Sequence, residues 1–457
     1  MSAPNVVVVG GGLAGISAAL DAADGGATVT LLERRGKLGG LTWSFKRKGR
    51  WFDNGQHVFL RCCTSYRSFL DRIGAGAMVH LQDRLEVPVL APGAKRAVIS
   101  RSSLPAPLHL LGSLARYRHL SVSDRVRLAR PAWALRRLDL DDPALDDVAF
   151  GAWLGAHGQR PEAIAALWNL IALPTLNVSA DEASLSLAAM VFRTGLLDAA
   201  DAGDIGWSKV PLGALHGEQA SRALAEAGVT VVLGASVDAV DATTGATRVV
   251  SFGDRSIEAD ALIVTAPPEV TAGLLPAGAL GPLDGLGSSP IVNVHLVLDR
   301  RVTDLSMFAC VRSPVQFVFD RTVSAHYGDA DRATEGEQCL SISLSAADAD
   351  IGRRPEDLVS GYLDALGEVV PAVRDAVLLD GVVSRERSAT FRAVPGSGTL
   401  RPGVATTLDR VLVAGAWCDT GWPATMEGAV RSGAAAAAAA LARLGTGVTP
   451  ELQEVAS

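Results

Sequence analysis

Residues 5–33 read NVVVVGGGLAGISAALDAADGGATVTLLE, and this stretch decides the fold. The β-branched run at 5–9 predicts a strand, the glycines after it predict a tight turn, and the small residues that follow predict a helix. A second predicted strand at 27–32 ends at Glu33. A strand, a G-x-G-x-x-G turn, a helix, a strand and an acidic residue is the order that a dinucleotide-binding fold requires.

Each glycine of that turn has a predicted task. Gly10 permits the turn, Gly12 lets backbone approach a pyrophosphate, and Gly15 lets the helix pack closely on the strand. The helix N-terminus is expected to face the phosphates. Glu33 is placed to accept hydrogen bonds from ribose hydroxyls.

Later parts of the chain resemble further pieces of the same domain. Strands are predicted at 229–233, 236–240, 260–266 and 411–415, and a long helix of small residues begins near Met426. The segment 291–299 alternates, with Val292, Val294, Leu296 and Leu298 on one face and Asn293 and His295 on the other.

The predicted fold class is therefore α/β. It comprises a Rossmann-like domain assembled from the discontinuous segments 1–75, 205–285 and 395–450, and an inserted α+β substrate domain with a mixed sheet plus helices. The inserted domain comes from 76–204 and 286–394, and 451–457 is a tail.

Composition restricts the class of protein further. With 457 residues, 48% hydrophobic and 20% charged, the chain is expected to be globular, and its net charge of −7 argues against nucleic acid as a partner. Five cysteines with no C-x-x-C pair indicate neither a disulfide framework nor a metal site such as zinc. The apolar N-terminus lacks the basic region of a signal peptide, and no window offers about 20 unbroken apolar residues. We expect a cytoplasmic protein, either free or peripheral at the inner face of the membrane.

An arginine-rich segment supports that second possibility. Eight arginines and a single acidic residue, Asp124, lie between 101 and 137, and Val122, Val126 and Trp133 share one helical face. Two interpretations stay open. The segment is an amphipathic surface for anionic lipid, or it is a solvated face whose arginines are neutralised by the acidic cluster at 139–147.

The motifs GGGLAG at 10–15, Glu33-Arg34 and KLGGL at 37–41 resemble the flavoprotein superfamily of amine oxidases and phytoene desaturases. The resemblance covers nearly the whole chain and implies FAD as cofactor. Besides the glycines of the turn and Glu33, the positions that it implies for FAD binding are Leu13, Ala14, Arg34, Gly39, Gly40, Leu41, Val237, Gly415, Ala416, Pro423, Thr425 and Met426.

Two further motifs, FDNGQHVF at 52–59 and TGWPATMEGAVRSG at 420–433, are similar to the squalene-associated branch, the hydroxysqualene dehydroxylases. That likeness implies a long isoprenoid substrate that loses a hydroxyl group and receives a hydride from reduced FAD. Such a step needs a proton donor at the hydroxyl and a pocket without water. The candidates are His57, Gln56 and Asp53, although the same segment could instead position the flavin.

One position departs from the family pattern. Relatives usually carry Gly-Asp where this chain has Gly415-Ala416, and Asp419 is the nearest acidic residue that could compensate. A carotenoid desaturase or isomerase of the same fold is the closest alternative, and a non-catalytic flavin or lipid-binding protein is a lesser one. An amine oxidase is disfavoured because Trp422-Pro423-Ala424 lacks paired aromatic residues. No second dinucleotide fingerprint is visible, so electrons are expected to come from an external donor.

Overall fold

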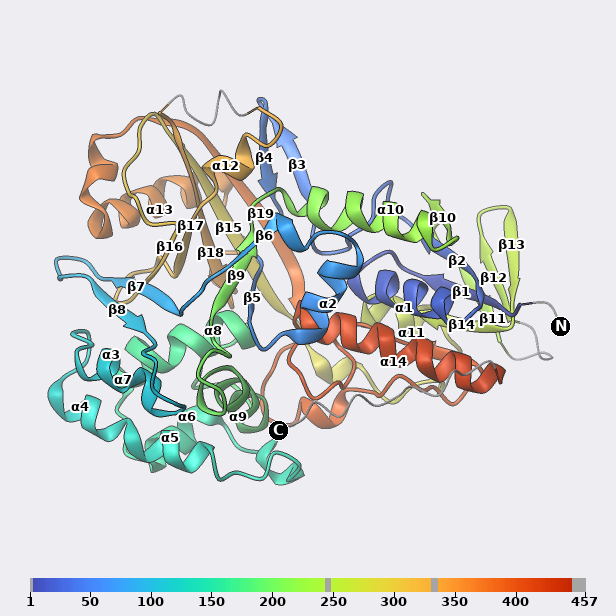
Figure 1. Cartoon of the computed structure of the whole chain (residues 1–457), viewed down its shortest axis with the longest axis horizontal. Coiled ribbons are helices and arrows are strands. Elements are labelled where there is room, and N and C mark those ends of the chain that lie inside the picture. Colours follow the sequence, from blue (N-terminus) through green and yellow to red (C-terminus); the bar gives the residue numbers. More distant parts are fainter. Residues whose placement is uncertain (1–2, 243–247, 330–335, 446–457) are drawn as a thin grey trace.

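A five-stranded parallel sheet forms around the strand that opens the chain (Figure 1). In the computed structural model, which describes residues 3–242, 248–329 and 336–445, its order is β10-β2-β1-β14-β20. Strand β1 (Asn5–Val9) pairs with β2 (Thr28–Glu33) on one side and with β14 (Ala261–Val264) on the other. Because all five strands are parallel, their carboxyl ends lie at one edge, where open α/β sheets bind ligands.

Two long helices pack against each other beside this sheet (Figure 1). Helix α1 (Leu13–Asp24) follows the first glycine turn, and α14 (Met426–Leu444) begins at the residue that the sequence predicts. A Cβ atom at Gly433 would lie 2.2 Å from the carbonyl oxygen of Ala14, so only glycine permits this approach. The alanine-rich face of α14 is thus a packing surface for α1.

A second sheet of seven strands has the order β19-β15-β18-β17-β16-β7-β8. Strand β15 (Ser289–Leu298), between β19 and β18, has one face in a hydrophobic core with α13 (Pro355–Val369). The alternation predicted for this strand is confirmed, because Val292, Val294, Leu296 and Leu298 all belong to that core. Asn293 and His295 are also buried, on the face that meets the loop after β4 (Arg50–Asp53).

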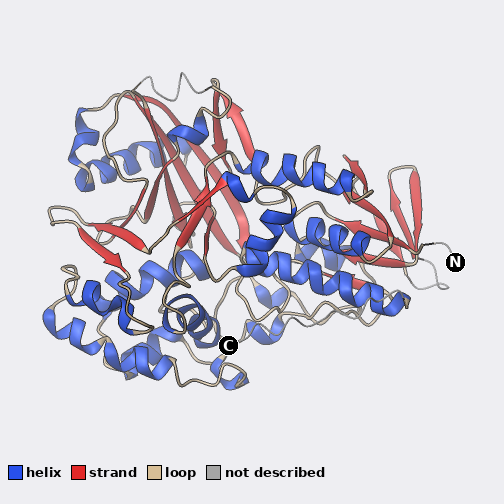
Figure 2. Ribbon diagram, in the orientation of Figure 1, coloured by secondary structure: helices blue, strands red, loops and turns tan. Residues whose placement is uncertain are grey.

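Short helices follow one another between β8 and β9, at 111–192, and gather at the lower left of the molecule (Figure 2). The strands not yet bounded are β3 (Ser44–Arg47), β5 (Val58–Leu60), β6 (Val79–Leu81), β7 (Glu86–Leu90), β8 (Ala97–Ser100), β9 (Ile205–Ser208), β10 (Thr230–Leu233), β11 (Ala239–Asp241), β12 (Arg248–Phe252), β13 (Arg255–Ala259), β16 (Met307–Cys310), β17 (Phe317–Asp320), β18 (Gln338–Ser345), β19 (Leu378–Thr390) and β20 (Val411–Val413). The remaining helices are α2 (Thr64–Arg72), α3 (Leu111–Ala115), α4 (Val122–Arg127), α5 (Ala129–Leu135), α6 (Phe150–Ala156), α7 (Pro161–Ala163), α8 (Asn169–Leu176), α9 (Leu185–Phe192), α10 (Gln219–Glu226), α11 (Pro268–Leu274) and α12 (Thr322–Ala325).

One predicted strand is wrong. The segment 236–240 was expected to be extended throughout, but a loop occupies 234–238 and the strand β11 covers Ala239–Asp241. The loop is held by the N–H of Ala235, which donates to the carbonyl oxygen of Glu33 at 2.9 Å. This bond keeps Ala235 beside the end of β2, and pairing of β11 with β12 begins only at Ala239. The predicted tail at 451–457 lies outside the described residues, and the proposed domain boundaries stay a prediction.

Candidate functional site: a dinucleotide cradle beside a polar loop

The first glycine turn is built so that backbone, not side chains, faces the edge of the sheet. Gly10 has a φ of +109°, and a Cβ atom at Gly15 would lie 1.9 Å from the carbonyl oxygen of Gly10. Gly40, with a φ of +57°, passes so close that its Cβ atom would lie 2.8 Å from the Cα of Gly12. Two glycine loops therefore meet at the carboxyl end of β1. A Cβ atom at Gly12 itself would make only an ordinary van der Waals contact, with the Cα of Gly40 at 3.8 Å.

Glu33 closes this cradle on the side of β2. It is buried, and its carboxylate accepts hydrogen bonds from the N–H groups of Gly11 and Arg35, each at 2.7 Å. These bonds fix the carboxylate directly beside the glycine turn. A carboxylate oxygen accepts more than one hydrogen bond, so the group retains capacity for a ribose hydroxyl.

The residues at this edge fit the dinucleotide half of FAD. No side chain caps α1, because Gly12 is its N-cap residue, so the first N–H groups of the helix face outward as in phosphate sites. Further positions predicted for FAD belong to the segments around this turn: Leu13 and Ala14 in the first turn of α1, Arg34 after β2, Gly39, Gly40 and Leu41 in the second glycine loop, and Val237 in the loop held beside Glu33.

At the other end of the cradle the loop after β20 leads into α14. Gly415 donates its N–H to the hydroxyl of Ser432, and Thr425 caps the helix by accepting from the N–H of Gly428 at 3.2 Å. Ala416 is half-buried between them, whereas Pro423 is buried and Met426 begins the helix. The N-terminus of α14 presents the positive end of its dipole to this region.

Asp419, the acidic residue nearest to Ala416 in the sequence, has its carboxylate engaged with Gly421 and Arg401. Its side chain accepts from the N–H of Gly421 and lies 3.8 Å from the guanidinium of Arg401, and it is largely exposed. Arg401, which sequence reasoning missed, is buried and donates to the carbonyl oxygens of Trp417, Cys418 and Trp422. A buried guanidinium therefore holds the shape of this loop, and Asp419 belongs to that arrangement.

The end of β4 and the loop after it carry the three residues predicted to be catalytic, and the structure gives them different environments. Asp53 is buried, and its carboxylate accepts from Ser44 at 2.6 Å and from Arg321 at 2.9 Å. The backbone N–H of Leu212 donates to it as well. With an ion pair and two further hydrogen bonds, Asp53 holds the loop in place.

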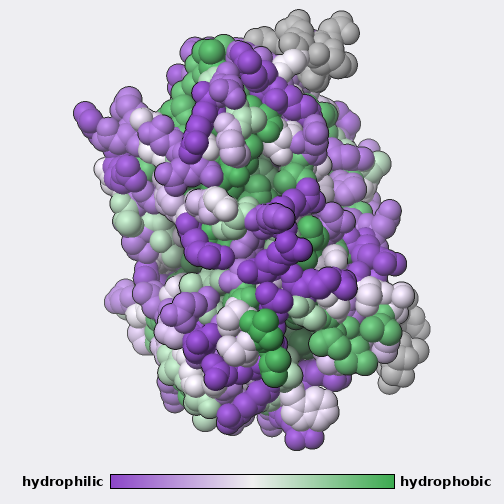
Figure 3. All heavy atoms as spheres, turned by 90° about the vertical axis from the view of Figure 1, so that its left-hand side faces the viewer, coloured by the Kyte–Doolittle hydropathy of each residue, from purple (hydrophilic) through white to green (hydrophobic). Residues whose placement is uncertain are grey.

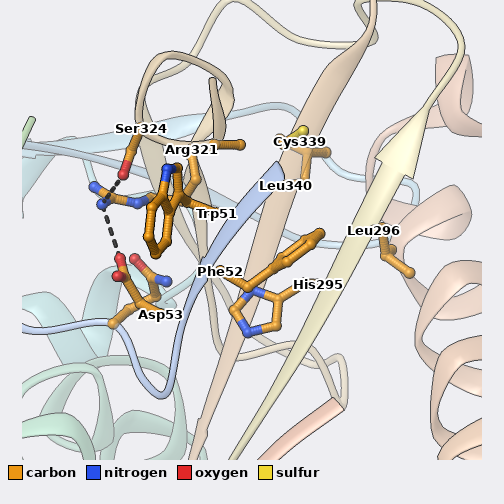
Figure 4. Close-up of a pocket in the computed structure, with 11 residues that line it drawn as sticks. Trp51, Phe52, Asp53, His295, Leu296, Arg321, Ser324, Cys339 and Leu340 are labelled. Carbon is orange, nitrogen blue, oxygen red and sulfur yellow. Dashed lines mark hydrogen bonds and ion pairs between the residues drawn. The ribbon is translucent and has the colours of Figure 1, made fainter. Parts of the chain in front are cut away.

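Gln56 lines a pocket beside this ion pair (Figure 4). Figure 4 shows Arg321 reaching both Asp53 and Ser324, with His295 and Phe52 across the pocket. The side-chain nitrogen of Gln56 is buried and has no hydrogen-bond partner among the described residues. An unsatisfied buried amide is costly, so this donor marks a place for a polar group that the chain does not supply.

His57 is half-buried, and its Nδ1 atom lies 3.3 Å from the carbonyl oxygen of Gly55. Burial lowers its pKa, whereas the hydrogen bond to Gly55 and the carboxylates of Asp53 and Glu386 act in the opposite direction. The neutral ring with its proton on Nδ1 donates to Gly55 and leaves Nε2 as an acceptor. Only the protonated ring can also donate a proton at Nε2.

Glu386 on β19 is a polar residue of this site that sequence reasoning missed. Its Oε1 atom accepts from the Asn54 amide at 2.9 Å and from the Trp43 indole at 3.2 Å. The same Asn54 amide donates to the carbonyl oxygen of Leu41, directly after the second glycine loop. Glu386 thus ties the seven-stranded sheet to both the cradle and the loop of His57. Nothing in the local sequence Arg385-Glu386-Arg387 distinguishes it from a solvated strand residue.

A separate cluster of His326, Glu337 and Cys339 lies on the far side of the pocket, with ligand atoms within 4.8 Å of one another. Arg50 donates two hydrogen bonds to the Glu337 carboxylate, at 2.6 and 2.8 Å. A guanidinium so close repels a cation. We interpret this cluster as an internal ion pair that fixes the β3–β4 hairpin.

Comparison with known proteins gives the family and the fold to which this glycine cradle belongs. The family model of flavin-containing amine oxidoreductases matches residues 13–441, from the start of α1 to the last turn of α14. The chain belongs to this family. Among solved structures, cyclohexylamine oxidase from Brevibacterium oxydans superimposes with a TM-score of 0.69 at 18% identity, over 97% of this chain and 100% of that one. A putrescine oxidase variant superimposes with a TM-score of 0.73 at 20% identity, over 96% and 99%. These structures share the fold.

The family includes curated relatives of similar length. A hydroxysqualene dehydroxylase from Rhodopseudomonas palustris is 28% identical over 96% of this chain and 98% of its own. One from Sinorhizobium fredii is 27% identical over 97% and 99%, and a 15-cis-phytoene desaturase from Synechococcus elongatus is 25% identical over 96% of both chains. As a member of the family, the protein is an FAD-dependent oxidoreductase, which leaves the non-catalytic alternative without support.

Proposed function

We propose that the protein removes the hydroxyl group of hydroxysqualene reductively and forms squalene. The observation that carries the proposal is the nearly full-length likeness to three hydroxysqualene dehydroxylases, at 25–28% identity. When bound, FAD in its reduced form supplies the hydride that replaces the hydroxyl group. In this balance the hydride forms the new C–H bond, and a single proton, donated by the protein, converts the leaving hydroxyl group to water.

The chain's own residues bind, orient and protonate in this proposal. The glycine cradle and Glu33 hold the dinucleotide, and the N-terminus of α14 stabilises negative charge on the reduced cofactor. Protonated His57 donates a proton from Nε2 to the leaving hydroxyl, and the unpartnered Gln56 amide donates a hydrogen bond to the same oxygen. Asp53, fixed by Arg321, and Glu386, fixed by Asn54 and Trp43, keep the loop in position.

Two further parts of the proposal concern what lies around the site. Electrons reach the flavin from an external donor, since a second G-x-G-x-x-G fingerprint with its strand and acid is not found in the sequence. We also propose that the protein is cytoplasmic and makes peripheral contact with the inner face of the membrane. No helix among the described residues is both long and apolar enough to cross a bilayer.

The second candidate function is desaturation of a carotenoid precursor, because phytoene and zeta-carotene desaturases match the chain at 25–26% identity. The two reactions run in opposite redox directions. In the dehydroxylation the substrate reoxidises the reduced flavin. In the desaturation the substrate reduces the oxidised flavin. Mixing each redox form with hydroxysqualene or phytoene under argon, while flavin absorbance is followed, separates them.

A further inference from the structure

The described surface carries a concentration of exposed apolar side chains in one short segment. Six of the fifteen large hydrophobic residues that are substantially exposed lie within thirty residues of one another. They belong to the loop before α3 and to the helices α3, α4 and α5, and we call them the apolar patch: Leu104, Leu108, Leu111, Val122, Val126 and Trp133. Soluble surfaces scatter such residues singly, so a cluster marks a contact surface.

The face that carries these helices lies at the left of Figure 1 and is turned toward the viewer in Figure 3. In its lower part, apolar side chains gather in groups between charged ones (Figure 3). Helix α3 contacts α4, and α4 contacts α5, so the elements of the patch adjoin one another. Val122 is 71% exposed and Val126 is 73% exposed, although they lie one helical turn apart on the same side of α4.

The arginines of this segment are not neutralised by the chain. None of the seven from Arg116 to Arg137 forms an ion pair with any described residue. The single acidic residue, Asp124, is paired with Arg160 at 2.6 Å instead. Arg101 differs, because it is anchored to the buried carboxylate of Asp204.

The acidic cluster at 139–147 has other partners. The Asp142 side chain accepts from the N–H of Ala144, and Asp146 is buried where it accepts from Ser184 at 2.7 Å. Asp139 accepts from the N–H of Asp141. No described residue of this cluster forms an ion pair with any of the seven arginines, which favours the first interpretation, a positively charged amphipathic surface.

Trp133 and Arg137 show how exposed apolar surface and positive charge are combined in this segment. The guanidinium of Arg137 lies 4.6 Å from the ring centre of Trp133, which is itself 54% exposed. A tryptophan under an arginine suits the boundary between acyl chains and lipid headgroups, since the ring is amphipathic and the guanidinium binds phosphate.

We propose that residues 101–137 dock on an anionic lipid bilayer, with the apolar patch inserted between the headgroups and the unpaired arginines on lipid phosphates. Positive charge and apolar surface together fit such a bilayer, whereas an acidic soluble partner uses the charge alone. The proposal concerns this surface and does not depend on the flavin reaction, so it stands or falls separately from the proposed substrate.

The test uses the full-length protein with FAD and sedimentation with vesicles of phosphatidylcholine, either pure or with about one third phosphatidylglycerol. The variant Val122→Ser/Val126→Ser/Trp133→Ser removes exposed apolar groups only. The matched control is Val323→Ser/Val377→Ser, whose parent side chains are 71% and 58% exposed but lie outside the patch. We expect the wild type and the control to bind anionic vesicles, and the patch variant to bind about tenfold more weakly or worse.

Three results would overturn the proposal. The wild type could fail to bind anionic vesicles. The patch variant could bind as well as the wild type, with salt alone abolishing binding, which would indicate a purely electrostatic contact with an acidic partner. Finally, sedimentation equilibrium without lipid could show a dimer that the patch variant converts to a monomer, which would assign the patch to a second copy of this chain.

Discussion

The guanidinium of Arg321 donates a hydrogen bond to the buried carboxylate of Asp53 at 2.9 Å, across 268 positions of the chain. This ion pair joins the segment after β17 to the loop that carries Gln56 and His57. Both partners are almost fully buried, so neither can be solvated if the other is removed. The pair therefore explains why Asp53 holds the loop in place.

Removing Arg321 is predicted to destabilise the protein strongly. Arg321→Met leaves an uncompensated buried carboxylate, which costs on the order of 3–5 kcal/mol in the free energy of unfolding. Urea denaturation of the FAD-free protein measures this loss in the free energy of unfolding. The matched control is Arg354→Met, whose pair with Asp357 is exposed and contributes little. Equal midpoints for Arg321→Met and the control would contradict the assignment of Asp53 as a structural anchor.

Alanine substitutions at two glycines of the first turn are predicted to have different effects on FAD affinity and on thermal stability. Gly12→Ala adds a methyl group that meets no protein atom closer than 3.8 Å, so the FAD-free protein should keep its thermal midpoint. The methyl group stands where backbone must approach the pyrophosphate, so FAD affinity should fall roughly tenfold or more. Flavin fluorescence quenching measures the affinity.

By contrast, Gly15→Ala places its methyl group 1.9 Å from the carbonyl oxygen of Gly10, and that backbone must move. The FAD-free protein should then lose thermal stability as well as FAD affinity. Gly36→Ala is the control, because nothing lies within 4 Å of its Cβ position. Undiminished FAD affinity in Gly12→Ala would show that the dinucleotide does not approach this backbone.

The rate of the proposed reaction should rise as pH falls. Burial lowers the pKa of His57, so the protonated ring that donates to the hydroxyl is a minor form near neutrality. His57→Asn should lower the single-turnover rate by about 10²–10⁴-fold and remove the pH dependence. In Glu386→Gln the loss of a nearby carboxylate should shift the acidic limb to lower pH, while Glu386→Asp should restore it in part. A profile that is the same in wild type and His57→Asn would exclude the proton role.

Stability should also depend on pH through two buried histidines. Burial lowers the pKa of His295 to about 4 and that of His216 to about 3, so both are neutral in the folded protein. The unfolded chain takes up protons on these rings below its ordinary pKa of about 6.5, so their contribution is complete above that pH and is lost as pH falls toward 4. Urea midpoints at pH 7.5 and 5 should differ, and His295→Gln should reduce the difference. An unchanged difference in that variant would place the acid sensitivity elsewhere.

Short-range sequence patterns predicted the first glycine turn, the strand after it and helix α14 well. The turn at Gly10–Gly15 and the strand ending at Glu33 follow from residues within thirty positions of each other, and the start of α14 follows from the run of small residues that begins near Met426. The strand expected at 236–240 failed because a bond to Glu33, from a distant part of the chain, decides where it begins.

The polar site was predictable only in part, for the same physical reason. His57 and Gln56 stand out in a short motif, whereas Glu386 meets Asn54 across 332 positions and resembles any charged strand residue. The arginine-rich segment likewise allowed two interpretations, because the sequence does not show which carboxylate each guanidinium contacts. The ion pair of Asp124 with Arg160 is a tertiary contact, which only the structure shows.

The proposed substrate is tested most directly by an anaerobic single turnover. The protein is loaded with FAD, reduced, and mixed with hydroxysqualene in detergent, while flavin absorbance is recorded and the lipid product is extracted. We predict that the flavin is reoxidised and that one squalene appears for each flavin. A flavin that stays reduced while hydroxysqualene is recovered unchanged would contradict the account, and bleaching of the oxidised protein by phytoene would replace it with desaturation.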